Sequence, residues 1–183
     1  MSMHDDVSEI LFSEEEIAQS VKRIGKQISQ DYAGKNLFLV SVLKGSLVFM
    51  ADLMRAIDIP CSIDFLAVSS YGKGTSSSGE VQVIKDLNCP LKDKDLLVVE
   101  DILDSGVTLS FLLKYLSARN PRSIRLCTLL DKPSRRIVKN LKADYIGMEV
   151  EDKFIIGYGL DYAEQYRNLP YIGVLNPACI QNG

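Results

Sequence analysis

Short apolar runs alternate with helical patterns along most of this chain. The runs have the length of single strands, and the segments between them repeat apolar residues at helical spacing. Helices are expected over residues 14–30, 47–57 and 109–117. Strands that alternate with helices pair mainly in parallel, so we expect a single α/β domain over residues 1–183, a mainly parallel twisted sheet flanked by helices. The expected strands are 36–43, 61–69, 81–85, 95–101, 123–130, 145–148 and 154–156.

Composition excludes several classes of function. The 21 basic and 24 acidic residues give a net charge of −3, which argues against a general nucleic-acid binder. The one histidine, His4, leaves Ser-His-Asp catalysis and histidine zinc sites almost without residues. The four widely spaced cysteines are typical of buried reduced thiols and not of a disulfide framework or a zinc site. With no membrane-spanning run and no apolar secretory leader, we expect a cytoplasmic protein that binds neither nucleic acid nor membrane.

The run LLVVEDILDSGVTLS, residues 96–110, carries the strongest signal for a ligand site. An apolar strand ends in Glu100 and Asp101, and the chain then turns through residues 104–108 into a helix. Ligands of open parallel sheets bind beyond the carboxyl ends of strands, where a helix start offers N–H groups to an anion. An ordinary helix cap would explain one polar residue here, but not three acids, a glycine and two hydroxyls. The segment predicts a phosphate site with contributions from Glu100, Asp101, Asp104, Ser105, Gly106 and Thr108.

Within this segment, VVEDILDSGVT resembles the phosphoribosyl-pyrophosphate (PRPP) motif of the type I phosphoribosyltransferases. That motif has an apolar run, two acids, two apolar residues and then D-[ST]-G-x-T. Two rival phosphate motifs fail, since residues 72–75 lack the Walker A pattern and residues 157–159 lack the third Rossmann glycine. The resemblance implies that residues 104–108 hold the 5-phosphate of PRPP, with Val107 using only its backbone, and that the ribose hydroxyls lie near Glu100 and Asp101.

Two further segments resemble loops of the same family. Lys44 and Gly45 follow the first long strand, like the pyrophosphate loop, in which the peptide entering the lysine is commonly cis. Without the resemblance, Lys44 would be a surface lysine in a turn. Ser70 and Tyr71 open a polar stretch that resembles the loop covering the active site during reaction, although its composition equally fits an ordinary disordered loop.

Two later segments, LLDKPS and DKFIIGYGLDY, resemble the hypoxanthine-guanine phosphoribosyltransferases, the purine-salvage branch of the family. By that resemblance Lys132 donates to the exocyclic oxygen of a 6-oxopurine, Phe154 stacks on its ring, and the Ile155 backbone contacts its edge. Asp161 would hold Mg²⁺ through water, and Arg167 would face the pyrophosphate. The residue types suit these roles. Without the resemblance, Lys132 could simply end a strand, Phe154 could be a core residue and Asp161 could be a surface acid.

The resemblance implies transfer of the 5-phosphoribosyl group from PRPP to hypoxanthine and/or guanine, giving IMP or GMP and pyrophosphate. Asp104 is the candidate general base, and Glu100, Asp101 and Asp161 are the candidate ligands of Mg²⁺. The implied fold is that of the type I phosphoribosyltransferases, with a small hood formed by chain-terminal segments. A homodimer or homotetramer is expected, with subunit contacts from an exposed apolar tail over residues 169–175.

Three alternatives remain to be weighed. Lys132 fits any 6-oxopurine, so xanthine is a possible acceptor. An RNA-binding regulator with the same fold should have a basic face, whereas this chain carries only scattered basic pairs such as Arg135-Arg136. A DNA-binding purine repressor would need a helix-turn-helix domain, for which we expect too few residues before Ser13.

Overall fold

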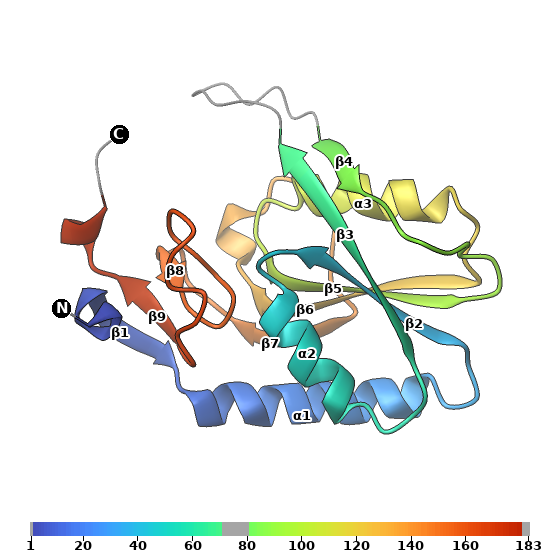
Figure 1. The fold of residues 1–183 in the computed structure, drawn as a ribbon, viewed down its shortest axis with the longest axis horizontal. Helices are drawn as coiled ribbons and strands as arrows, with labels where there is room; N and C mark the ends of the chain where they lie inside the picture. Colours follow the sequence, from blue (N-terminus) through green and yellow to red (C-terminus); the bar gives the residue numbers. More distant parts are fainter. Residues whose placement is uncertain (1, 71–80, 181–183) are drawn as a thin grey trace.

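The main body of the protein is a six-stranded sheet with the order β4-β3-β2-β5-β6-β7. The structure is a computed structural model and describes residues 2–70 and 81–180 (Figure 1). Each neighbouring pair of strands is parallel except β3 and β4, which confirms the mainly parallel sheet. The strands are β2 (Leu37–Leu43), β3 (Ser62–Ser70), β4 (Val81–Lys85), β5 (Asp95–Leu103), β6 (Ser123–Asp131) and β7 (Tyr145–Glu149).

Helices cover both faces of this sheet, as predicted. Side chains of a strand alternate between faces, so Leu37 and Leu39 of β2 pack with α1 and α2, whereas Phe38 and Val40 pack with α3. Figure 1 shows α1 and α2 on one side of the sheet and α3 on the other. Burial on both faces explains why β2 is an almost continuous apolar run. The helices are α1 (Glu14–Asp31), α2 (Leu47–Ala56) and α3 (Val107–Ser117).

A second, smaller antiparallel sheet has the order β1-β9-β8 and lies at the left of Figure 1. It joins β1 (Val7–Phe12) from the beginning of the chain to β8 (Ile155–Ile156) and β9 (Ile172–Leu175) from its end. This arrangement confirms the expected hood of chain-terminal segments. Sequence reasoning did not predict β1 or β9. Strand β1 pairs only with β9 near the other end of the chain, and β9 lies between β1 and β8.

The predicted exposure of the apolar tail over residues 169–175 is wrong. Leu169, Ile172 and Leu175 are each at most 1% exposed. Strand β9 hydrogen-bonds to β1 and β8, so its apolar side chains pack within the same chain. The tail is therefore part of the hood, and the homodimer or homotetramer stays a prediction.

Three short 3₁₀ helices and the cysteines complete the description. All four cysteines are free thiols, as expected, but only Cys127 is buried, so the expected burial is wrong for the other three. None of the helices within residues 2–70 and 81–180 is long and apolar enough to cross a membrane. The 3₁₀ helices are η1 (Met3–Asp6), η2 (Pro133–Arg135) and η3 (Pro177–Cys179).

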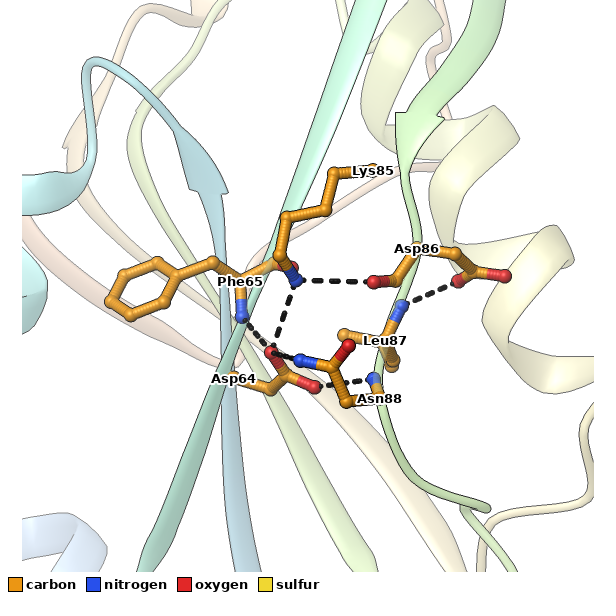
Figure 2. A network of polar contacts seen from close by, with 6 residues as sticks. All are labelled: Asp64, Phe65, Lys85, Asp86, Leu87 and Asn88. Atoms are coloured by element: carbon orange, nitrogen blue, oxygen red, sulfur yellow. Dashed lines mark hydrogen bonds and ion pairs between the residues drawn. The ribbon is translucent and has the colours of Figure 1, made fainter.

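Hydrogen bonds to the Asp64 carboxylate connect β3 to the end of β4 and the residues after it, at the antiparallel edge of the main sheet (Figure 2). Asp64 of β3 accepts hydrogen bonds from the N–H groups of Phe65, at 2.7 Å, and Asn88, at 2.8 Å. Lys85 Nζ, at the end of β4, lies 3.3 Å from the same carboxylate. Burial alone would raise the pKa of Asp64, but these donors outweigh it and lower the pKa below its ordinary value.

We expect Asp64→Asn to reduce the free energy of unfolding by about 1–2 kcal/mol at pH 7, because the amide loses charge-assisted hydrogen bonds. A carboxylate with a lowered pKa stabilises the fold above its unfolded-state pKa of about 4, and this contribution disappears as pH falls through the folded-state value. Urea unfolding from pH 7 to pH 3 should show the gap between wild type and variant narrowing below about pH 4. Asp58→Asn, at an exposed aspartate, is the control. A gap that is constant over the whole range would contradict the prediction.

Candidate active site

A cavity of about 260 Å³ lies where two loops meet at the carboxyl ends of β2 and β5. These strands are parallel neighbours, so their following loops come together at one edge of the sheet. One loop supplies Gly45, and the other supplies most of the predicted phosphate site. Val107 is the exception, since its side chain is exposed in the first turn of α3. The lining residues are Val42, Leu43, Gly45, Glu100, Asp101, Ile102, Asp104, Ser105, Gly106, Thr108 and Leu109.

The loop after β2 passes so close to Asp101, near the end of β5, that any larger residue at position 45 would displace the Asp101 carboxylate. A Cβ atom built there would lie 1.8 Å from Asp101 Oδ2. The opposite side of the same loop is packed just as closely, because a Cβ atom on Gly159 would lie 2.1 Å from the Gly45 carbonyl oxygen. The peptide between Leu43 and Lys44 is cis, as the resemblance implied. Residues 43–45 are therefore fixed between the end of β5 and the segment that follows β8.

Two adjacent acids occupy the cavity wall. Burial, reinforced by the neighbouring Asp101, raises the pKa of Glu100 well above its ordinary range. Burial also raises the pKa of Asp101 to about 6. Paired carboxyls of this kind favour a bound cation, and carboxylate oxygen is the ligand type that Mg²⁺ prefers. Among the described residues, however, no three His, Cys, Asp or Glu side chains form a group that could hold a metal ion, so Asp161 does not join Glu100 and Asp101 in one cluster.

The turn from β5 into α3 is built by backbone geometry. Gly106 precedes the first residue of α3 with φ of +81°, a conformation that glycine adopts without a steric penalty. The Asp104 carboxylate accepts the N–H of Ser105, and Ser105 Oγ lies 3.4 Å from the Val107 nitrogen. The helix begins at Val107, two residues before the predicted start, and has no side-chain hydrogen bond at its N-cap. Asp104 itself is exposed at the cavity.

A chain of charged side chains connects Lys44 to Arg167. Lys44 Nζ lies 2.6 Å from Glu164 Oε2, and Arg167 Nη2 lies 3.3 Å from the other oxygen of Glu164. The same Arg167 atom lies 2.9 Å from Asp161 Oδ1. The hydrogen bond from Lys44 lowers the pKa of Glu164. Sequence reasoning missed Glu164, which brings three of the predicted residues together.

Arg167 does not line the cavity beside the phosphate loop. It lines a larger cavity of about 690 Å³ between α1, α2 and residues 167–170. That cavity shares no lining residue with the smaller one. Arg167 is thus connected to the predicted pyrophosphate loop through Glu164 and through its own hydrogen bond to the Gly159 carbonyl, at 2.8 Å.

Lys132 and Phe154, two of the residues predicted to bind a purine, lie on segments joined by a hydrogen bond. The N–H of Lys132 donates to Leu103 O at 2.9 Å, which places Lys132 beside the end of β5. Its Nζ reaches Lys153 O at 2.8 Å, next to Phe154. The Phe154 ring is 47% exposed and meets Tyr162 edge-on, with 5.5 Å between ring centres. The Lys132 ammonium group therefore lies next to the segment that carries the exposed Phe154 ring, and Ile155 follows in β8.

The predicted active-site loop has only its first residue within the described part of the chain. Ser70 is the last residue of β3. Tyr71 lies outside the described residues. The assignment of these two residues to a covering loop stays a prediction.

Comparison with known proteins agrees with this geometry. The model of the phosphoribosyl transferase domain family matches residues 7–163. The hypoxanthine-guanine phosphoribosyltransferase of Bacillus subtilis (strain 168) is 51% identical over 180 residues, which cover 98% of this chain and 99% of that protein. Bifunctional TilS/HprT proteins of Listeria monocytogenes are 51% identical over 176 residues, but the match spans only 27% of their length.

Solved structures give the same result. The crystal structure of a hypoxanthine phosphoribosyltransferase from Staphylococcus aureus superimposes with a TM-score of 0.94 at 50% sequence identity. The match covers 98% of this chain and 97% of that one. Sequence identity, coverage and fold thus agree over nearly the whole chain, including the phosphate loop and the hood. The chain belongs to the phosphoribosyltransferase family, in its hypoxanthine-guanine branch.

Proposed function

We propose that this protein transfers the 5-phosphoribosyl group from PRPP to hypoxanthine or guanine, producing IMP or GMP and pyrophosphate. The observation that carries the proposal is that Lys132, whose backbone bonds to the end of β5, reaches with its ammonium group the residue immediately before the exposed Phe154 ring. In the proposed complex, Lys132 and Phe154 would hold the purine, and residues 104–108 would hold the 5-phosphate of PRPP. The imidazole edge of the purine would then face the anomeric carbon of the ribose. The full-length match to hypoxanthine-guanine phosphoribosyltransferases supports the same activity.

In the proposed reaction the bond from the anomeric carbon to pyrophosphate breaks, and a bond to a purine ring nitrogen forms. The proton on the imidazole ring moves to the Asp104 carboxylate, which is exposed at the cavity and therefore accessible to substrate. The ammonium of Lys44 and the guanidinium of Arg167 would stabilise the departing negative charge. Glu164 pairs with both of these cations.

Base selection follows from the donor chemistry of Lys132. An ammonium group donates hydrogen bonds and cannot accept them. It therefore pairs with the exocyclic oxygen of hypoxanthine or guanine and not with the amino group of adenine. Phe154 offers an exposed ring on which a purine can stack, and the Ile155 backbone is at its edge.

The carboxylates fit a magnesium ion. Glu100 and Asp101 would supply carboxylate oxygen ligands. Burial raises the pKa of both groups, so a bound cation would favour their ionised forms. Asp161 would supply a third carboxylate at a separate position. Fewer than three clustered ligands suit an ion that keeps several waters and is bound together with substrate phosphates. When bound, Mg²⁺ would neutralise charge on the pyrophosphate leaving group.

A base-selectivity assay tests the proposal. With PRPP and Mg²⁺ present, hypoxanthine, guanine, xanthine, adenine and uracil are supplied separately, and nucleotide formation is followed spectrophotometrically. We expect nucleotide from hypoxanthine, guanine or both, and none from adenine or uracil. Turnover of xanthine alone would change the assigned acceptor. No turnover with any base, in a folded protein that binds PRPP, would contradict the enzyme and favour a nucleotide-sensing regulator.

A further inference from the structure

Arg136 lies behind the loop over residues 104–106 and does not line its cavity. Its side chain is only 10% exposed. Arg136 Nε donates to the carbonyl oxygen of Asp104 at 2.8 Å, and Nη2 donates to that of Leu103 at 3.1 Å. One guanidinium group therefore binds the carbonyls of two successive peptides where β5 turns into the loop.

The backbone after Arg136 extends this pattern by one peptide. The N–H groups of Ile137 and Val138 donate to Ser105 O at 2.9 and 3.1 Å. In a trans peptide the N–H points away from the C=O of the same unit. Since the carbonyls of residues 103–105 all face the segment 136–138, the N–H groups of residues 104–106 face the other way. Residues 104–106 line the cavity and Arg136 does not, so these N–H groups lie on the cavity side.

Arg136 is itself fixed. Its Nη1 donates to Leu141 O at 2.8 Å, and its Nη2 also pairs with the carboxylate of Asp131, which is 16% exposed. The loop packs directly on this group, because a Cβ atom on Gly106 would lie 3.4 Å from Arg136 Cδ. All three guanidinium nitrogens have partners in several directions. A lysine has a single nitrogen and cannot reproduce such a fork.

We infer that Arg136 is a positioning residue for the 5-phosphate. It holds the carbonyls of residues 103 and 104 at the back of the loop, so that the backbone of the loop turns its carbonyl oxygens away from a bound anion and its N–H groups toward it. Asp131 neutralises its charge and fixes its orientation. The inference rests on the proposed function, in which this loop receives the 5-phosphate of PRPP and of the product nucleotide.

Steady-state kinetics of Arg136→Gln and Arg136→Lys test this role. Both variants should raise the KM for PRPP by roughly tenfold or more, while kcat and the KM for hypoxanthine stay within about threefold of wild type. The matched control is Arg135→Gln, because the neighbouring Arg135 side chain is 62% exposed and pairs with Asp152 at 3.0 Å. It should behave like wild type. Full activity in Arg136→Lys would overturn the inference, because charge alone would then suffice.

Product binding gives a readout that general destabilisation would not move. In calorimetry, the Kd for GMP should rise by the same factor in both Arg136 variants, whereas the Kd for guanosine should not change, because only GMP carries the 5-phosphate. Equal losses for both ligands would overturn the inference. Failure of the wild type to bind GMP would contradict the proposed function itself. If the Arg136 variants do not fold, Asp131→Asn replaces them. A rise in the Kd for GMP smaller than that expected for the Arg136 variants, with an unchanged Kd for guanosine, would then support the inference.

Discussion

Asp104→Asn is expected to lower kcat at least ~100-fold, while the KM for PRPP stays within about threefold of wild type. Asparagine has the shape of aspartate and keeps an oxygen that can accept the Ser105 N–H, so the turn into α3 should persist. The amide cannot take up the proton that the imidazole ring of the purine loses. The variant therefore removes an interaction needed in the transition state and leaves the binding of the phosphate unchanged.

The measurement is a full kinetic analysis with hypoxanthine and PRPP as varied substrates. Asp58→Asn, an exposed aspartate outside the cavity, controls for the loss of one negative charge. Near-normal turnover in Asp104→Asn would remove Asp104 from the mechanism. A large rise in the KM for PRPP with unchanged kcat would show that its carboxylate serves only to shape the loop.

The turn from β5 into α3, which we propose binds phosphate, was predictable because it is local. A buried strand, two acids, a turn with Gly106 and a helix follow one another within a single stretch of chain. The fold places that stretch at the carboxyl end of β5, as open parallel sheets do with their ligand sites. Lys44 and Gly45 follow β2, a parallel neighbour of β5 that ends at the same edge, but only the family resemblance singled them out in the sequence.

Pairings between distant parts of the chain were not predictable. Strand β1 pairs with β9 through contacts such as Val7 with Leu175, and no local pattern marks either strand. The residues that link the parts of the site also contact segments that are distant in the sequence. Glu164 reaches Lys44 from a segment whose backbone has φ of +64° at Glu164 itself, and Arg136 reaches back to carbonyls more than thirty residues earlier. Spacing carries no signal for such contacts.

The purine side lies between these cases. Lys132, Phe154 and Ile155 come from two segments, and composition alone does not distinguish them from a strand end and core residues. Only resemblance to a family grouped them. The structure supplies the physical link, which is the hydrogen bond from Lys132 Nζ to the carbonyl of Lys153, the residue immediately before Phe154.

Lys132→Gln is expected to lower kcat/KM for hypoxanthine and guanine roughly 100-fold, because a charged donor to the exocyclic oxygen is lost. The glutamine amide carries an oxygen that can accept from an amino group, so the ratio of kcat/KM for hypoxanthine to that for adenine should fall. The Kd for PRPP should not change, since the Lys132 side chain does not line the cavity beside the phosphate loop.

Lys153→Gln is the matched control. Lys153 immediately precedes Phe154, but its ammonium group pairs with Glu9 at 2.8 Å. Both variants remove one positive charge, and only Lys132→Gln removes the donor that faces the proposed base. Competition assays with hypoxanthine and adenine would separate the two. If the two variants lost activity equally, or if Lys132→Gln lowered kcat/KM without changing the ratio between the bases, Lys132 would be a structural residue. Base selection would then have to come from the backbone beside Ile155, where carbonyl and N–H groups can read a purine edge.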